Sequence, residues 1–196
     1  MKLRSIESMP DLVGKKVLVR VDHNVTLNDD GTLKDDKKLR VSIPTLEYLV
    51  DRGAKLTLMT HVGRPKGKVV DELKVAPIFE RLKELSSKMS DVAYLENVRF
   101  SSGEQDNEES FINELASHGE FFVNEAFPSM HTYEEASTCG VARLLPSYAG
   151  FHFQKEVDAL SNVTSDPKRP LTLILSGAKM KTKIPVIKRF LDFADN

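Results

Sequence analysis

Five short, almost continuously apolar runs constrain the fold of this chain more than any other feature. They are KVLVRV (16–21), KLTLMT (55–60), VAYLE (92–96), EFFVN (120–124) and LTLILS (171–176). The runs are rich in β-branched residues, lack strict alternation and are bounded by Gly, Asp or Asn. This pattern is typical of strands that are covered on both faces, and it predicts a strand at each run.

Amphipathic segments with helical spacing lie between these runs. The segments at 40–53, 75–89 and 109–119 carry apolar residues three or four positions apart, and the first and third end at glycine. Alternation of strands with helices predicts a three-layer, Rossmann-like α/β domain with a mainly parallel sheet and helices on both faces. A further helix is predicted at 153–163, then a turn-rich breaker at 165–170. A last helix is predicted from Ile184, with Pro185 in its first turn.

The composition excludes several classes of partner. Twenty-eight Lys and Arg residues against 29 Asp and Glu residues leave a formal charge of -1, which favours neither a nucleic-acid nor a membrane-surface partner. The single cysteine, Cys139, cannot form an internal disulfide and suits a reducing cytoplasm. The N-terminal stretch MKLRSIESMP has no apolar core long enough for a signal peptide, and no apolar run approaches the length that spans a membrane. We therefore expect a cytoplasmic protein.

Polar residues follow the predicted strands at the points where ligands bind in open parallel sheets. They are Asp22, His23 and Asn24 after the first run, His61 and Arg64 after the second, Arg99 after the third, His131 after the fourth, and Lys179 and Lys183 after the fifth. So many cationic groups on a near-neutral chain favour a small ligand that carries phosphate or carboxylate, because arginine donates to both groups through two parallel hydrogen bonds.

Several of these residues also have an ordinary explanation. The His61 and Arg64 side chains could be solvated in a loop, Asp22 and Asn24 could form an Asx-turn, and Arg99 could pair with Glu96 or Glu104. No HxxxH or CxxC spacing supports a metal site. The dinucleotide and P-loop signatures GxGxxG and GxxxxGK[ST] are also absent.

Six motifs in series are similar to those of the phosphoglycerate kinase family. They are VLVRVDHNV (17–25), SIPTLEYLVDRGAKL (42–56), HVGRPKG (61–67), LENVRF (95–100), VNEAF (123–127) and SGAKMKTKI (176–184). The resemblance implies a substrate lobe at 1–152, an interdomain helix and linker at 153–169, and the first βα unit of a nucleotide-binding lobe at 170–196. Enzymes of this family hold 3-phosphoglycerate in the first lobe and Mg-ATP or Mg-ADP in the second, and transfer a phosphoryl group between them in glycolysis.

The resemblance also implies roles for individual residues. Asp22, His23, Asn24, Lys38, His61, Arg64, Arg99 and His131 are implied to bind 3-phosphoglycerate. Lys179 and Lys183 are implied to bind the nucleotide, and Lys38 and Lys183 to act in catalysis. No metal ligands are implied, and the parent enzyme is expected to be a monomer.

The chain departs from the family pattern at several positions. Lys38 stands where the family has its catalytic arginine, His23 replaces a phenylalanine, and Ser176 replaces a glycine. Thr132 or Tyr133 replaces an arginine. Next to it, Glu134 and Glu135 add negative charge that should weaken phosphate binding by repulsion. A βα unit is missing between Met89 and Val92.

The sequence stops soon after the predicted start of the nucleotide-binding lobe. We therefore expect this chain alone to be inactive and to bind no nucleotide tightly. A non-catalytic binding or interaction protein derived from the kinase is the alternative.

Overall fold

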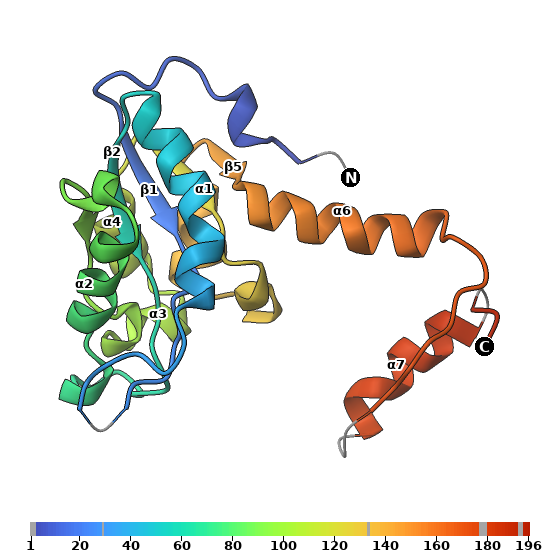
Figure 1. Ribbon diagram of the computed structural model, residues 1–196. Coiled ribbons are helices and arrows are strands. Elements are labelled where there is room, and N and C mark those ends of the chain that lie inside the picture. Colours follow the sequence, from blue (N-terminus) through green and yellow to red (C-terminus); the bar gives the residue numbers. More distant parts are fainter. Residues whose placement is uncertain (1–2, 29, 133, 177–179, 192–193) are drawn as a thin grey trace. The chain divides into compact units, whose positions relative to one another are not determined.

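The fold is organised around a five-stranded, entirely parallel sheet (Figure 1). The computed structural model describes residues 3–28, 30–132, 134–176, 180–191 and 194–196. The strands are β1 (Lys16–Arg20), β2 (Lys55–Met59), β3 (Ala93–Tyr94), β4 (Phe121–Asn124) and β5 (Ser147–Ala149), in the spatial order β3-β2-β1-β4-β5. The predicted fold class is confirmed.

Four predicted runs form β1 to β4, whereas β5 was not predicted. The segment SYA of β5 is only three residues long and partly exposed, and it follows Pro146, so it carries no strong strand signal. It is a strand because it pairs with β4, with Phe122 opposite Ser147 and Asn124 opposite Ala149. An edge position on an existing sheet therefore decided its conformation.

Helices α1 (Lys37–Asp51), α2 (Ala76–Leu85), α3 (Gly103–Asp106), α4 (Glu109–Ala116) and α5 (Val141–Leu144) belong to the same part of the chain as the sheet. Helix α6 (Phe151–Ser165) begins in this part, and α7 (Met180–Leu191) follows it along the chain. Short 3-10 turns lie at η1 (Ile6–Ser8), η2 (Asp71–Leu73), η3 (Ser87–Met89), η4 (Val98–Phe100) and η5 (Phe127–Thr132), and a π-helical turn lies at η6 (Ala136–Gly140).

Alternate residues of β1 enter two different cores, as expected for a strand that is covered on both faces. Val17 and Val19 pack in one cluster with α1 and α2, which contribute Leu46 and Leu82 among others. Leu18 packs in a second cluster with residues of α4 and α5. The predicted helices on both faces are thus observed.

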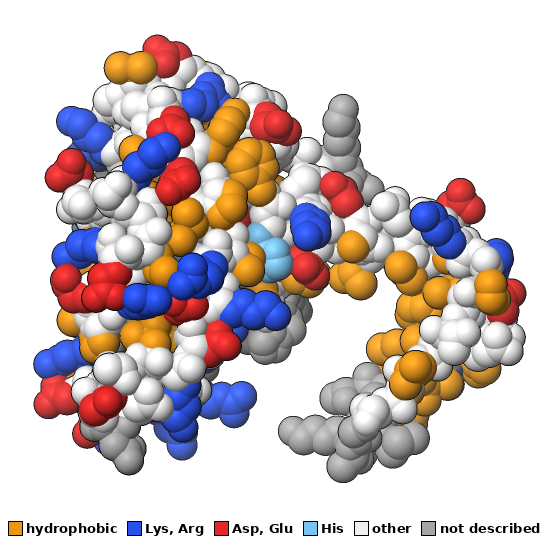
Figure 2. Space-filling model, viewed as in Figure 1, with side chains coloured by type: hydrophobic (Ala, Val, Ile, Leu, Met, Phe, Trp, Pro, Cys, Tyr) orange, Lys and Arg blue, Asp and Glu red, His pale blue; other side chains and the backbone are white. Residues whose placement is uncertain are grey.

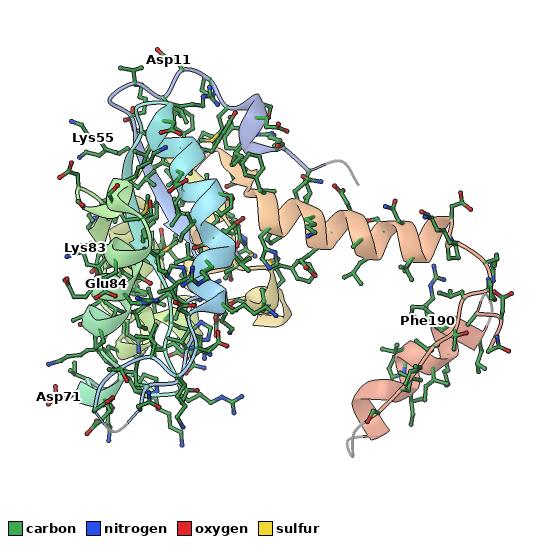
Figure 3. The ribbon with its side chains drawn as sticks, viewed as in Figure 1. Asp11, Lys55, Asp71, Lys83, Glu84 and Phe190 are labelled. Carbon is green, nitrogen blue, oxygen red and sulfur yellow. The ribbon has the colours of Figure 1, made fainter. Side chains whose placement is uncertain are left out.

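The outer surfaces of the helices are charged. On α2, Lys83 pairs with Glu80 and Glu84 pairs with Arg81, and the labelled side chains of Lys83 and Glu84 project away from the helix (Figure 3). Side chains of both signs are interspersed over the face seen in Figure 2, in agreement with the near-zero net charge.

The chain divides into two compact units, Met1–Glu156 and Val157–Asn196. In the second unit, the strand predicted at 171–176 is wrong, because these residues form no strand. The Leu171 carbonyl accepts hydrogen bonds from the amides of Asp195 and Asn196. Leu173 also donates to the Asn196 carbonyl, but these few bonds do not build the continuous ladder that defines a strand. The last helix begins at Met180 rather than Ile184, so Pro185 lies inside α7 and not in its first turn.

A buried carboxylate holds the first turn of α6. Glu125 follows β4 and accepts hydrogen bonds from Thr45 Oγ1 on α1 (2.7 Å) and from the amides of His152 (3.1 Å) and Phe153 (3.4 Å). Any side chain at Gly150 would collide with this carboxylate. Burial raises the pKa of Glu125 to about 7. The start of α6 is therefore joined to β4 and α1 through one ionisable group.

Replacing this carboxylate should change how stability depends on pH. Because the pKa of Glu125 is raised, the folded protein binds the proton at a higher pH than the unfolded chain does as the pH falls. The ionised carboxylate therefore lowers the free energy of unfolding above pH 7, and this destabilisation fades as the pH falls towards 5. We expect the free energy of unfolding of Glu125→Gln, relative to the unmodified chain, to be about 2 kcal/mol higher at pH 8 than at pH 5 in urea titrations.

The matched control is Glu114→Gln, which changes an exposed residue of α4. Its difference from the unmodified chain should stay within about 0.5 kcal/mol at both pH values. A pH-independent effect of Glu125→Gln would show that this carboxylate carries no shifted titration.

Candidate functional site

The carboxyl ends of β1, β2 and β3 meet at a cavity of about 470 Å³, which we call the rim pocket. Its lining residues are Asn24, His61, Gly63, Arg64, Lys66, Arg99, Gln105 and Glu135. Parallel strands place their carboxyl ends at one edge of a sheet, and this brings His61, Arg64 and Arg99 together although they lie far apart in the sequence.

Asp22 and Asn24 connect the segment after β1 to its neighbours. Asn24 Oδ1 accepts a hydrogen bond from the Gly63 amide (3.0 Å), which ties this segment to the loop after β2. Lys38 Nζ forms an ion pair with Asp22 Oδ2 (2.9 Å) and donates to the Asn24 carbonyl (3.1 Å). Lys38 on α1 is therefore in direct contact with both predicted substrate anchors.

A second cavity, of about 290 Å³, lies beside this contact. It is lined by Asp22, Lys37, Lys38, Val41, Ser42, Glu125, Pro128 and His152. Asp22 and Lys38 line this cavity and not the rim pocket, whereas Asn24 lines the rim pocket. The ion pair between Asp22 and Lys38 and the contacts of Asn24 therefore connect the linings of the two cavities.

Arg20, the last residue of β1, lies behind the rim pocket and is fully buried. Its Nη2 donates to His61 Nδ1 (2.8 Å), its Nε donates to Ser137 Oγ (2.8 Å), and its Nη1 donates to the Val21 carbonyl (2.8 Å). An arginine can only donate, so His61 Nδ1 accepts and the proton of the neutral ring lies on Nε2. Arg20 thereby sets the tautomer and orientation of His61.

Two buried carboxylates compensate the charge of Arg20. Burial lowers the pKa of Arg20, while the charges of Glu104 and Glu135 act in the opposite direction. Glu104 accepts hydrogen bonds from the amide (2.9 Å) and hydroxyl (2.5 Å) of Ser137, and burial raises its pKa. Sequence reasoning missed Arg20. The available signal was a charged residue inside the apolar run KVLVRV, since a buried arginine requires partners.

Arg99 is also buried and paired. Its Nη2 lies 2.6 Å from Glu135 Oε1, and its Nη1 donates to the Gly63 carbonyl (3.1 Å). The partner is therefore neither Glu96 nor Glu104, the two acids that the sequence offered. The sequence predicted only that Glu135 would repel an anionic ligand. In the structure, Glu135 contacts Arg99, which is one of the arginines predicted to bind that ligand.

The loop after β2 presents the exposed cations of the pocket. Gly63 has a φ of +61°, and a side chain there would clash with Leu73. This turn leaves Arg64 and Lys66 exposed on the pocket lining. Among the described residues, no carboxylate lies within ion-pair distance of either side chain.

Comparisons with known proteins identify the family. The family model described as "Phosphoglycerate kinase" matches residues 6–90 and 86–196. This chain belongs to the phosphoglycerate kinase family. The solved phosphoglycerate kinase from Coxiella burnetii is 30% identical and superimposes with a TM-score of 0.90, covering 99% of this chain and 53% of the enzyme. The kinase from Pyrococcus horikoshii OT3 is 27% identical with a TM-score of 0.83, covering 97% and 53%. The chain thus spans about half the length of these phosphoglycerate kinases.

The resemblance inferred from the six motifs is therefore confirmed, whereas the role that it implies for His23 stays a prediction. His23 is fully buried, with Nδ1 2.9 Å from the Tyr94 hydroxyl and Nε2 2.8 Å from Ser42 Oγ. Ser42 donates its own proton to the Leu39 carbonyl, so His23 Nε2 is the donor and Nδ1 the acceptor. Burial lowers the pKa of His23 to about 3. Both ring nitrogens of His23 are therefore engaged within the protein, and its side chain is not exposed to solvent.

Three other predicted residues cannot be placed in the site. Lys179 lies outside the described residues. His131 lies in η5 and Lys183 in α7, but their side chains lie outside the described part of the chain. Their implied roles stay predictions.

In the part that is described, no cluster of His, Cys, Asp and Glu is arranged to hold a metal ion, and no helix is both long and apolar enough to cross a membrane.

Removing the buried charge behind the pocket should destabilise the protein. In Arg20→Met, Glu104 loses its compensating charge while Glu135 keeps its ion pair with Arg99, and we expect the free energy of unfolding to fall by about 3–5 kcal/mol in urea titrations. Adding Glu104→Gln to this variant should recover part of the loss. Arg40→Met, at an exposed position of α1, is the control and should cost less than about 1 kcal/mol. A small loss in Arg20→Met would contradict the role given to this network.

Proposed function

We propose that this chain forms the 3-phosphoglycerate-binding lobe of a phosphoglycerate kinase, which transfers a phosphoryl group between ATP and the substrate carboxylate as a step of glycolysis. The observation that carries the proposal is the rim pocket, where exposed Arg64 and Lys66 adjoin Asn24 and the oriented ring of His61. Planar guanidinium groups and ammonium groups at the mouth of a pocket are suited to a phosphate-bearing acid.

Each part of the substrate has a complementary group in this proposal. Arg64, with His61 and Arg99, binds the phosphate of 3-phosphoglycerate. Asp22 and Asn24 anchor the remainder of the molecule, because their oxygens accept and the Asn24 amide donates. His131 is proposed as a further phosphate ligand on the family pattern alone. The ion pair with Asp22 keeps Lys38 beside the predicted position of the substrate carboxylate.

We propose that catalysis rests on positioning and charge neutralisation, because phosphoryl transfer needs little covalent chemistry from the protein. Lys38 supplies positive charge where carboxylate and transferring phosphoryl meet. It lacks the planar fork of arginine, and it cannot bridge the two groups through paired hydrogen bonds. Lys38 therefore supports a slower reaction than an arginine in the same place.

The domain boundaries and the nucleotide site belong to the same proposal. Residues 1–152 form the substrate lobe, 153–169 form the connecting helix and linker, and 170–196 form the beginning of a nucleotide-binding lobe. Lys179 and Lys183 are proposed to contact the phosphates of Mg-ATP or Mg-ADP, which is the second substrate. The other half of the length of the solved kinases has no counterpart in this sequence, and we propose that turnover requires such a part.

Binding to the rim pocket should depend on its exposed arginine. We expect the 196-residue chain to bind 3-phosphoglycerate with a Kd of about 1 mM or weaker in a two-dimensional NMR titration. Arg64→Ala should weaken binding at least about tenfold, because it removes charge-assisted hydrogen bonds to phosphate. Arg40→Ala, exposed on α1 away from the pocket lining, should bind as the unmodified chain does. No binding by the folded chain would refute the proposal.

The catalytic role of Lys38 is testable in a polypeptide that also carries a nucleotide-binding part. There, Lys38→Arg should raise kcat about tenfold in a coupled assay, because the fork of arginine can hold both reacting groups. Lys34→Arg at an exposed position is the control and should leave kcat unchanged. The 196-residue chain alone is the blank and should show no ATP-dependent product. An unchanged kcat in Lys38→Arg would remove Lys38 from the catalytic position.

A further inference from the structure

The rim pocket contains a carboxylate that competes with an anionic ligand for one of its arginines. Glu135 and Arg99 both line the pocket and are 5% and 9% exposed, and their charged groups lie 2.6 Å apart. The Glu135 carboxylate thus contacts the guanidinium group of Arg99, which is proposed above to bind the phosphate of the substrate.

The charges on the pocket lining are unequally available. Arg64, Lys66 and Arg99 bring three positive charges and Glu135 brings one negative charge. Because Glu135 is in ion-pair contact with Arg99, its charge cancels that of Arg99 more strongly than those of the exposed pair. The effective positive field at the pocket therefore comes from Arg64 and Lys66.

The backbone holds Glu135 in this position. Its carbonyl oxygen accepts hydrogen bonds from the amides of Thr138 (3.2 Å), Cys139 (3.1 Å) and Gly140 (3.3 Å), and from Thr138 Oγ1 (3.0 Å). These bonds place Glu135 directly before the π-helical turn η6. These bonds fix the main chain of Glu135, and its carboxylate contacts Arg99 from that position.

Arg99 retains an unused donor next to this contact. Its Nε is buried and has no hydrogen-bond partner among the described residues, whereas Nη1 and Nη2 are engaged. A buried donor without an acceptor is unfavourable, and a guanidinium usually presents Nε and one Nη together to a planar anion. Glu135 therefore satisfies Arg99 only in part, since one donor of the guanidinium stays without an acceptor in the described part of the chain.

We propose that Glu135 sets the affinity of the rim pocket by occupying, on Arg99, the place that a ligand's phosphate would take. The inference rests on the proposed function and adds the residue that limits it. A phosphate must either displace the carboxylate, which breaks its buried ion pair with Arg99, or bind without Arg99. Glu134 is exposed and does not line the pocket, so it has no such effect.

The test compares Glu135→Gln with Glu134→Gln in NMR titrations of the 196-residue chain with 3-phosphoglycerate. Glu135→Gln keeps the shape of the side chain but removes the negative charge that neutralises Arg99. The Kd for 3-phosphoglycerate should therefore fall at least tenfold. Glu134→Gln should change Kd less than twofold. The affinity for D-glycerate, which lacks the phosphate, should not increase in Glu135→Gln. Adding Arg99→Lys to Glu135→Gln should abolish the gain.

The outcomes separate this inference from the proposed function. If the unmodified chain binds, Arg64→Ala weakens binding, and Glu135→Gln is no tighter, the inference is wrong and the proposed function stands. Equal gains in Glu134→Gln and Glu135→Gln would also overturn it, since they would reflect overall charge. If no variant binds, both fail. Should circular dichroism show that Glu135→Gln is unfolded, Glu135→Asp, which withdraws the carboxylate by one methylene, must show a smaller gain of the same sign.

Discussion

A guanidinium with no exposure to water must be surrounded by acceptors and compensated in charge, and Arg20 imposes this requirement on the whole carboxyl edge of the sheet. It orients His61 from the end of β2, holds Ser137 at the start of η6, and interacts with Glu104 of α3 and with Glu135. Arg20 thereby holds together segments that are distant in the sequence, and two of its neighbours, His61 and Glu135, line the rim pocket.

This arrangement divides the cations of the site into two classes. Arg20 and Arg99 are buried and paired with carboxylates, so they organise the pocket more than they attract a ligand. Arg64 and Lys66 are exposed by a loop that turns at Gly63, and they supply the accessible positive charge. The positive electrostatic field at the pocket of this phosphoglycerate kinase family member is therefore weaker than a count of its basic residues would indicate, because carboxylates offset Arg20 and Arg99.

The same edge of the sheet also positions α6. Glu125 follows β4 as Asp22 follows β1, and it accepts hydrogen bonds from α1 and from the first turn of α6. Both Asp22 and Glu125 line the cavity beside Lys38. Two residues proposed to act on the substrate, Asp22 and Lys38, therefore line the same cavity as the residue that holds the start of α6.

The sequence by itself determined the parallel α/β fold, strands β1 to β4, the family, and the set of polar residues at one edge, because these follow from local periodicity and from ordered motifs. Only the tertiary structure decided which of these side chains face solvent. His23 became a core residue, Arg99 paired with Glu135 and not with a nearer acid, and the apolar run at 171–176 formed no strand. Each of these outcomes depends on contacts with residues that are distant in the sequence, and such contacts cannot be predicted from the neighbouring residues alone.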